Sequence, residues 1–164
     1  MHCNYKNYKT IKTILITGSN KGIGFETARQ LANLGNHVII AARNETKLKQ
    51  AVEKLKAEQL DVEDLLMDIS DEKSISLAAK EFAKRKLNLD VLINNAAVLY
   101  KDDISIIQAN EVLQQTLLTN SIGTLHVCKA FLQFMKHPSR IINISSGGGS
   151  MSDPVSGWSP AYCV

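Results

Sequence analysis

Three glycines follow the first apolar run of the chain at a spacing that suits the binding of a phosphate group. They stand in the segment Thr17-Gly18-Ser19-Asn20-Lys21-Gly22-Ile23-Gly24. Glycines let the backbone approach a pyrophosphate closely, and the first turn of a helix offers free N–H groups and a positive dipole end. Residues 25–35 continue with the apolar spacing of such a helix and end at a glycine. We therefore predict a strand, a phosphate-binding turn and a helix, in the order of a dinucleotide site.

The glycine spacing distinguishes this loop from other phosphate-binding turns. The order here is Gly-x-x-x-Gly-x-Gly, whereas the common dinucleotide fingerprint is Gly-x-Gly-x-x-Gly. A P-loop requires a lysine directly after its last glycine, but Lys21 precedes Gly22. A plain strand-to-helix turn needs one glycine and not three. The residues expected to hold the pyrophosphate are Gly18, Ser19, Asn20, Lys21, Gly22, Ile23 and Gly24.

The end of the second apolar run carries a basic residue where folds that prefer NAD carry an acidic one. The residues there are Ala42, Arg43 and Asn44, of which we expect Arg43 and Asn44 to contact the cofactor. No carboxylate would repel a 2′-phosphate, and the Arg43 guanidinium could pair with it. Lys21 could add a second positive charge. We infer that the chain binds NADP(H) in preference to NAD(H), with a solvated surface arginine as the alternative interpretation of Arg43.

Polar residues also end the third and fourth apolar runs. Asp68, before Ile69, can accept a hydrogen bond from the adenine amino group, or it can cap the following helix, and both interpretations stay open. The fourth run ends in Asn94-Asn95-Ala96-Ala97. Asparagines at the end of a buried strand need hydrogen-bond partners, and small residues after them let a cofactor pass. We expect cofactor contacts from Asp68, Ile69, Asn95, Ala96 and Ala97.

Strand and helix patterns alternate along the whole chain. Strands are expected at residues 13–16, 37–41, 63–68, 89–93 and 141–144, and helices at 25–35, 45–58, from 70 or 71 to 86, and 110–135. This alternation predicts an α/β fold, a doubly wound parallel sheet (Rossmann fold) with the ligand at the carboxyl ends of its strands. The residues at those ends are Gly18, Arg43, Asp68, Asn95 and Ser146. We expect one domain over residues 12–164 after a disordered or frayed tail at 1–11.

Composition excludes several classes of protein. The chain has 164 residues, 45% of them hydrophobic, and 19 basic against 16 acidic residues give a net charge of +3, which is too mild to argue for nucleic acid or membrane. No apolar run approaches the ~20 residues of a membrane span. The three cysteines and four histidines are dispersed without the spacing of metal ligands. We expect a cytoplasmic protein with no metal site.

Several of these motifs occur in the order typical of one family. The chain resembles the short-chain dehydrogenase/reductase family through the Thr17–Gly24 loop, Asp68, the Asn94-Asn95-Ala96 segment, Asn120, and Asn143-Ile144-Ser145-Ser146 followed by Tyr162. The resemblance covers residues 12–164. Ala97 stands where the family usually has glycine, and alanine is the next smallest residue.

The resemblance implies an oxidoreductase that transfers a hydride between the nicotinamide of NADP(H) and a small-molecule carbonyl or alcohol substrate. It implies that Ser146 hydrogen-bonds the substrate oxygen, that Tyr162 donates or accepts its proton, and that Asn120 holds a water in the proton relay. The apolar members of the loop between Ser146 and Tyr162 are Met151, Val155 and Trp158, and their position favours an apolar or aromatic carbonyl substrate.

The family's Tyr-x-x-x-Lys motif would place its lysine at position 166, two residues past Val164. We therefore expect the N-terminal two-thirds of a reductase, C-terminally incomplete, with weak or no activity of its own. The helix at 110–135 is apolar on more than one face, so we expect a homo-oligomer when the protein is full length. The alternatives are a non-catalytic NADP(H)-binding module or truncated pseudoenzyme, and a chain that serves only as an interaction partner.

Overall fold

A computed structural model describes residues 10–100 and 109–146 of the protein. Several predictions concern residues outside these ranges. They include most of the predicted N-terminal tail, the apolar residues Met151, Val155 and Trp158, and the proposed proton donor Tyr162.

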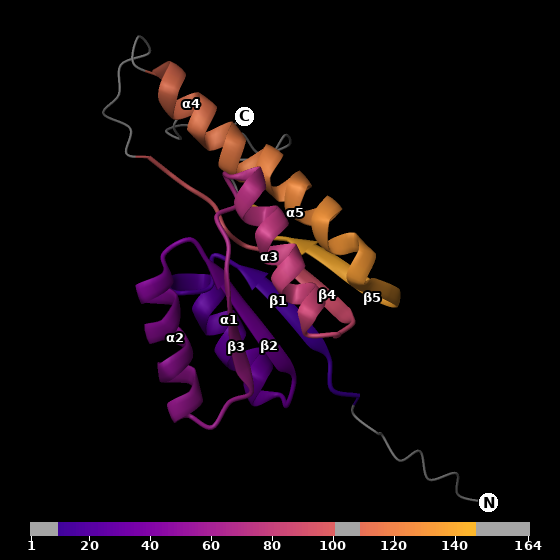
Figure 1. Ribbon diagram of the computed structural model, residues 1–164. Helices are drawn as coiled ribbons and strands as arrows, with labels where there is room; N and C mark the ends of the chain where they lie inside the picture. The colour runs from indigo at the N-terminus through magenta and orange to yellow at the C-terminus, as the bar shows by residue number, and fades with distance from the viewer. Residues whose placement is uncertain (1–9, 101–108, 147–164) are drawn as a thin grey trace, which may run out of the picture.

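The centre of the fold is a five-stranded sheet in which all the strand pairs are parallel (Figure 1). The strand order β3-β2-β1-β4-β5 places the first strand in the middle and confirms the predicted doubly wound α/β fold. The strands are β1 (Thr13–Thr17), β2 (His37–Ala42), β3 (Val62–Leu66), β4 (Leu89–Asn94) and β5 (Met135–Asn143).

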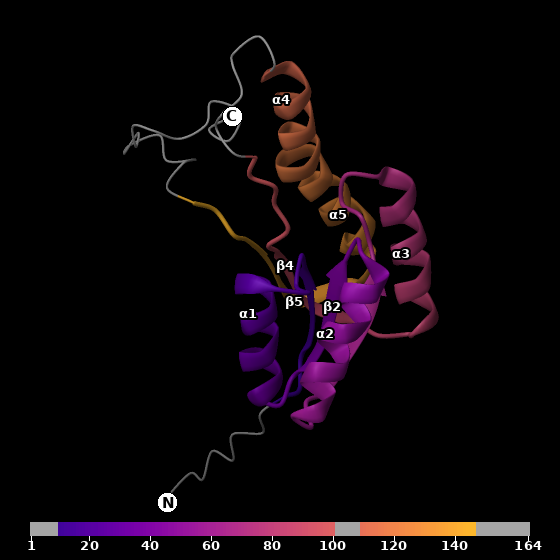
Figure 2. The ribbon, with the colours of Figure 1, turned by 90° about the vertical axis from the view of Figure 1, so that its left-hand side faces the viewer.

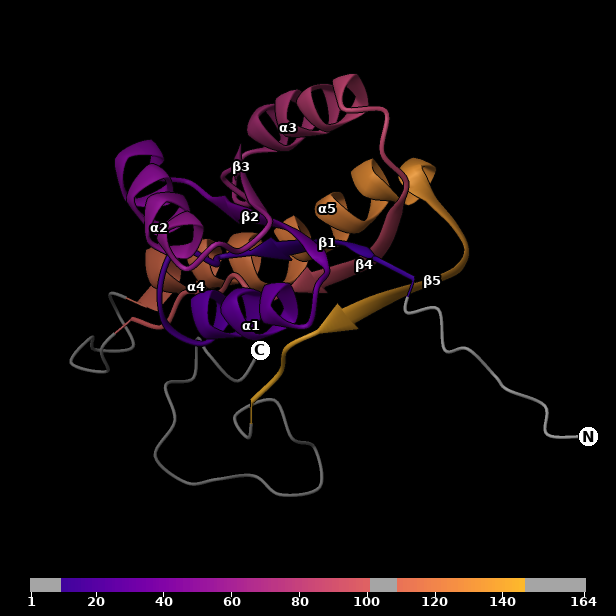
Figure 3. The same cartoon turned by 90° about the horizontal axis from the view of Figure 1, so that it is seen from below.

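Helices cover both faces of the sheet, and Figures 2 and 3 show α1 and α3 on opposite sides of it. One face is covered by α1 (Gly22–Asn33) and α2 (Glu45–Ala57). The other face is covered by α3 (Glu72–Lys84) and α5 (Thr124–Phe131). Two of the helix starts are capped by side chains that the sequence offers, since Asn44 accepts from the N–H of Lys47 and Asp71 accepts from the N–H of Lys73.

The hydrophobic core has two halves because successive side chains of a strand point to opposite faces. Ile14 and Ile16 of β1 pack with α1 and α2, whereas Leu15 between them packs with α3 and α5. On the second face Phe82 and Phe131 are fully buried, with ring centroids 5.6 Å apart. Burial on both faces explains why the central strands β1 and β2 are nearly continuous apolar runs without a polar alternation.

The prediction of a single helix over residues 110–135 is wrong in detail. The structure instead has four successive elements there: α4 (Ala109–Leu117), a π-helical segment η1 (Leu118–Gly123), α5 and a 3₁₀ turn η2 (Leu132–Phe134). Strand β5 begins directly after this turn, at Met135, because Met135 pairs with Leu89 of β4 before the register shifts.

The expected apolar surface on this helix is confirmed, since Ile122, Leu125 and Leu132 are 45%, 53% and 60% exposed. Within the described ranges, none of the helices is both long and apolar enough to cross a membrane.

Candidate functional site

A groove of about 710 Å³ opens at the carboxyl ends of β1, β2 and β4. Its size falls within the range of about 300–1,000 Å³ that is usual for sites of small molecules and cofactors. Segments far apart in the sequence meet here, because parallel strands all end at the same edge of the sheet. The lining residues predicted from the sequence are Gly18, Asn20, Lys21, Gly22, Ile23, Gly24, Arg43, Asp68, Ile69, Asn95, Ala96 and Ala97.

Hydrogen bonds between the ends of β1 and β4 hold the floor of this groove. The buried hydroxyl of Thr17 accepts from the backbone N–H groups of Asn95 and Ala96, both at 3.0 Å. In return, the amide Nδ2 of Asn95 donates to the carbonyl oxygens of Thr17 at 2.9 Å and Gly18 at 3.1 Å. Asn95 therefore acts as a clamp on the glycine loop, which accounts for an asparagine at the end of a buried strand.

Two glycines of the loop are required by close contacts. Gly18 has a φ of +64°, and a Cβ at this position would lie 2.7 Å from the Cα of Ala96. A Cβ on Gly24 would collide with the Asn95 amide and would lie 2.8 Å from the carbonyl oxygen of Gly18. The absence of a side chain at these two positions keeps the floor of the groove open, as a bound pyrophosphate requires.

The N-terminus of α1 is free to receive an anion. The residue before the helix, Lys21, provides no side-chain cap, and the first turn contains no acidic residue. The N–H groups of that turn therefore remain available, and the helix dipole favours negative charge there. The first carboxylate of α1, Glu26, is held by Arg29 at 2.7 and 2.9 Å. Hydrogen bonds from Arg29 and Gln30 lower the pKa of Glu26 to about 2, and Arg29 compensates its charge.

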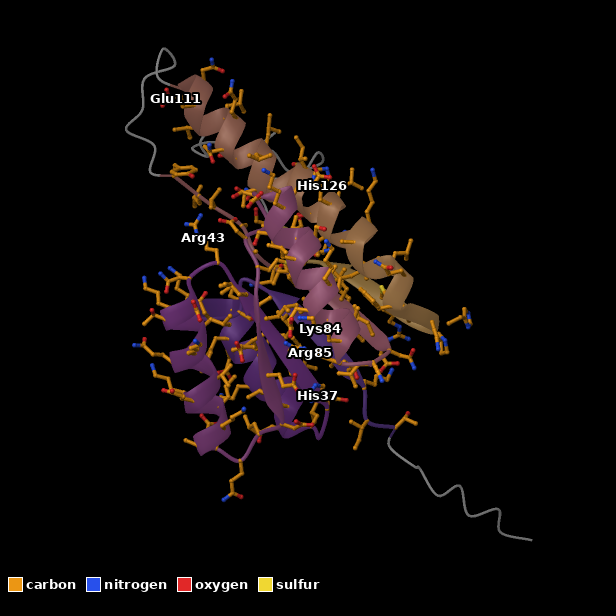
Figure 4. The ribbon with its side chains drawn as sticks, viewed as in Figure 1. His37, Arg43, Lys84, Arg85, Glu111 and His126 are labelled. Atoms are coloured by element: carbon orange, nitrogen blue, oxygen red, sulfur yellow. The ribbon has the colours of Figure 1, made fainter. Side chains whose placement is uncertain are left out.

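Two basic residues flank the groove. Lys21 lies at the start of α1 and Arg43 lies just beyond the end of β2, where Figure 4 labels it. Both are exposed, and neither forms an ion pair or hydrogen bond through its side chain within residues 10–100 and 109–146. Their charges are therefore available to a phosphate.

Asp68 does not cap the helix after β3. The N-cap of α3 is Asp71, whereas Asp68 closes the turn before it by accepting from the N–H and the hydroxyl of Ser70, at 2.9 and 2.7 Å. Both bonds use Oδ1. The other oxygen, Oδ2, has no hydrogen-bond partner among the residues that the structure describes, so it can accept from a ligand.

The π-helical segment η1 brings the middle of the long helix against this site. The side chain of Asn120 is bonded at both ends to Val98, accepting from its N–H at 2.9 Å and donating to its carbonyl at 3.0 Å. Gly123 packs against the backbone of Ile69, since a Cβ on it would collide with that carbonyl oxygen. Single π-helical turns inside α-helices occur frequently at functional sites.

The end of β5 and the residue after it are hydrogen-bonded to β4 next to the groove. Asn94 donates through Nδ2 to Oδ1 of Asn143 at 2.8 Å and to Sγ of Cys128 at 3.2 Å. The N–H of Ile144 donates to the carbonyl of Asn94 at 2.9 Å. Ser146, two residues later, is exposed and does not line the groove.

Two expected cofactor residues do not line the groove. Ser19 is fully buried, and its hydroxyl donates to the carbonyl of Ile16 at 2.7 Å and accepts from the N–H of Ala41 at 3.0 Å. The Asn44 side chain caps α2. Both side chains already form hydrogen bonds with backbone groups, so they support the site without lining it. The lining residues that the sequence patterns did not reveal are Ala42, Met67, Val98, Leu99, Tyr100 and Thr119.

Thr119 is the most informative of these additions, because it is polar and only 6% exposed. It lies in η1, next to Asn120, and its proximity to that residue is the one signal that could have suggested it. No group of three or more His, Cys, Asp or Glu side chains that could hold a metal ion occurs in the part of the chain that the structure describes.

The chain is similar to known proteins in sequence and in structure. A sequence model of the short chain dehydrogenase family matches residues 12–163. Carbonyl reductase [NADPH] 1 of Mus musculus is 40% identical over 135 residues, covering 80% of this chain and 48% of that protein. (+)-Neomenthol dehydrogenase of Arabidopsis thaliana is 32% identical over 174 residues, covering 92% of this chain and 58% of that protein.

The fold is likewise similar to solved structures. The NADPH-bound carbonyl reductase from chicken fatty liver superimposes with a TM-score of 0.82 at 27% identity, covering 93% of this chain and 68% of that one. The present chain spans about half the length of the curated relatives that it matches.

Proposed function

The chain belongs to the short chain dehydrogenase family, and from this premise we propose that it binds NADP(H) and serves hydride transfer between the nicotinamide and a carbonyl or alcohol substrate. The observation that carries the proposal is the groove beside the uncapped N-terminus of α1, flanked by Lys21 and Arg43. The names of the mouse and chicken relatives, both linked to NADPH, support the same cofactor.

The residues that line the groove suit the pyrophosphate, the 2′-phosphate, the adenine and the nicotinamide of a dinucleotide. The glycine loop leaves space where side chains would collide, and the free N–H groups of α1 suit a pyrophosphate. Arg43 would pair with the 2′-phosphate, and Oδ2 of Asp68 would accept from the adenine amino group. Ala96 and Ala97 would let the nicotinamide half pass. When bound, the nicotinamide would supply or accept the hydride.

The remaining roles concern the substrate and its proton. We propose that the Ser146 hydroxyl hydrogen-bonds the substrate oxygen and that Tyr162 donates or accepts its proton. Asn120 keeps one hydrogen on Nδ2 and one lone pair on Oδ1 beyond its two bonds to Val98, and through these it would hold a water in the proton relay. An apolar or aromatic carbonyl compound is the proposed substrate class.

The cofactor preference is tested by replacing Arg43 with alanine. We expect NADPH affinity to fall about tenfold to a hundredfold, because a charge-assisted hydrogen bond contributes about 1.5–3 kcal/mol, while NADH affinity stays nearly constant. Cofactor fluorescence or calorimetry on the purified chain gives both constants. Lys47→Ala on α2 is the matched control, since Lys47 is exposed and does not line the groove.

Equal losses for NADPH and NADH in the Arg43 variant would contradict the pairing with a 2′-phosphate. Absence of binding of either cofactor to the folded wild-type chain would contradict the proposed function as a whole. Binding without oxidation of NADPH by any carbonyl compound would instead support a non-catalytic binding module.

The buried hydroxyl of Thr119 provides a second test, independent of charge. Thr119→Val keeps the shape of the side chain, and we expect it to weaken NADPH binding roughly threefold to tenfold by removing one hydrogen bond to the cofactor. Thr119→Ser keeps the hydroxyl and should bind nearly as the wild type does. Unchanged affinity in Thr119→Val, measured by the same titration, would show that the hydroxyl does not reach the cofactor.

A further inference from the structure

A separate groove of about 460 Å³ lies between α3 and α5, on the face of the sheet opposite α1. Figures 1 and 2 both show these two helices side by side. It shares no lining residue with the groove at the strand ends. Its volume suits a small molecule, for which sites span about 300–1,000 Å³.

The floor of the α3–α5 groove is apolar and firmly supported. Ile75 and Ala79 of α3 are buried, and Phe134, the last residue of η2, packs on the fully buried ring of Phe82 at a centroid distance of 4.9 Å. Ala83 and Ala130 also line the groove, and both side chains are too small to close the gap between the helices. The groove is therefore a surface that apolar atoms of a ligand can cover.

The rim of the same groove is basic. Lys80 of α3 and His126 and Lys129 of α5 line it, together with one carboxylate, Glu72, and Figure 4 labels His126 on α5. These three basic side chains form no hydrogen bond or ion pair with the residues that the structure describes. By contrast Lys84, one turn further along α3, is paired with Glu81 at 2.7 Å. Unpaired positive charge around an apolar floor is complementary to an anion.

We propose that the α3–α5 groove binds a small amphipathic anion, an apolar chain that ends in a carboxylate. The chain would lie along Ile75, Ala79 and Phe134, and the carboxylate would lie between the ammonium groups of Lys80 and Lys129. Lysine stems can cover apolar surface while their charged ends stay in water, so both parts of such a ligand are matched. This inference does not depend on the proposed redox function.

The test is a titration of the full chain with octanoate, followed through the backbone amide shifts of α3 and α5 by NMR. Octanol and octylammonium are the neutral and cationic comparison ligands. We expect octanoate to bind most tightly and to bind about tenfold more weakly to the double variant Lys80→Glu, Lys129→Glu. The matched control is Lys56→Glu, Lys73→Glu, which makes the same charge change at exposed helical positions outside the groove.

A second variant tests the apolar part of the proposal. Ala83 is exposed, so Ala83→Leu should leave the fold intact while it fills the groove and abolishes octanoate binding. Circular dichroism confirms that each variant is folded. Equal affinity for octylammonium, or octanoate binding that neither the charge reversal nor Ala83→Leu weakens, would overturn the proposal. So would a dimer of the wild type, seen by sedimentation, that Ala83→Leu dissociates, because a second copy of the chain would then occupy the groove.

Discussion

Alanine at Gly18 is expected to destabilise the protein by roughly 2–5 kcal/mol and to abolish NADPH binding. Gly18 has a φ of +64°, and a residue with a Cβ loses about 1–2 kcal/mol in this conformation. The added Cβ would also lie 2.7 Å from Cα and 2.9 Å from Cβ of Ala96, and overpacking of this kind costs about 1–3 kcal/mol more. Urea unfolding gives the first effect, and cofactor fluorescence gives the second.

Gly22 is the matched control for Gly18. It has nearly the same φ, +62°, but a Cβ there would meet nothing within 4 Å. Gly22→Ala should therefore cost only the backbone term of about 1–2 kcal/mol. The difference between the two variants isolates the contact with Ala96. Equal destabilisation by both would show that this contact relaxes without cost, which would contradict the close packing of the loop against the end of β4.

Valine at Thr17 is expected to lower the free energy of unfolding by roughly 2–6 kcal/mol. The Thr17 hydroxyl is the acceptor for the N–H groups of Asn95 and Ala96, and the side chain is 1% exposed. Valine has nearly the same shape but accepts no hydrogen bond, and each buried donor left without a partner costs about 1–3 kcal/mol. The ends of β1 and β4 should then separate more readily, and NADPH binding should weaken as well.

Serine at Thr17 distinguishes the contribution of the hydroxyl to the free energy of unfolding from the contribution of side-chain packing. Thr17→Ser keeps the acceptor and loses one methyl group, so we expect a cost of about 0.8 kcal/mol. Chemical unfolding of both variants under the same conditions makes the comparison. If valine were tolerated as well as serine, the two N–H groups would have found other partners, and the hydroxyl would not be what joins the strand ends.

The location of the site was readable in the sequence. The apolar runs that form β1, β2 and β4 each end in a polar residue or a glycine, and the fold topology brings Gly18, Arg43 and Asn95 to one groove. Local patterns suffice for this because the strand period, the glycine spacing and the parallel topology all depend on neighbouring residues or on general rules of chain connection. The capping of α2 by Asn44 is also a local interaction. From the sequence we nevertheless expected Asn44 to contact the cofactor and did not predict that its side chain caps the helix.

The detailed use of each polar residue was decided only by tertiary structure. Thr17 and Asn95 are 78 residues apart, and Asn120 in η1 hydrogen-bonds to Val98 in the chain after β4. Whether a side chain faces a ligand or supports the backbone depends on such distant partners, which no local pattern specifies.

The same holds for the π-helical break at residues 118–123 and for the burial of Ser19. The sequence by itself determined the α/β topology and the location of the groove at the strand ends, because both follow from local periodicity. The tertiary structure decided which side chains line the groove and created the α3–α5 groove, because packing between distant segments determines which polar atoms and which spaces stay free.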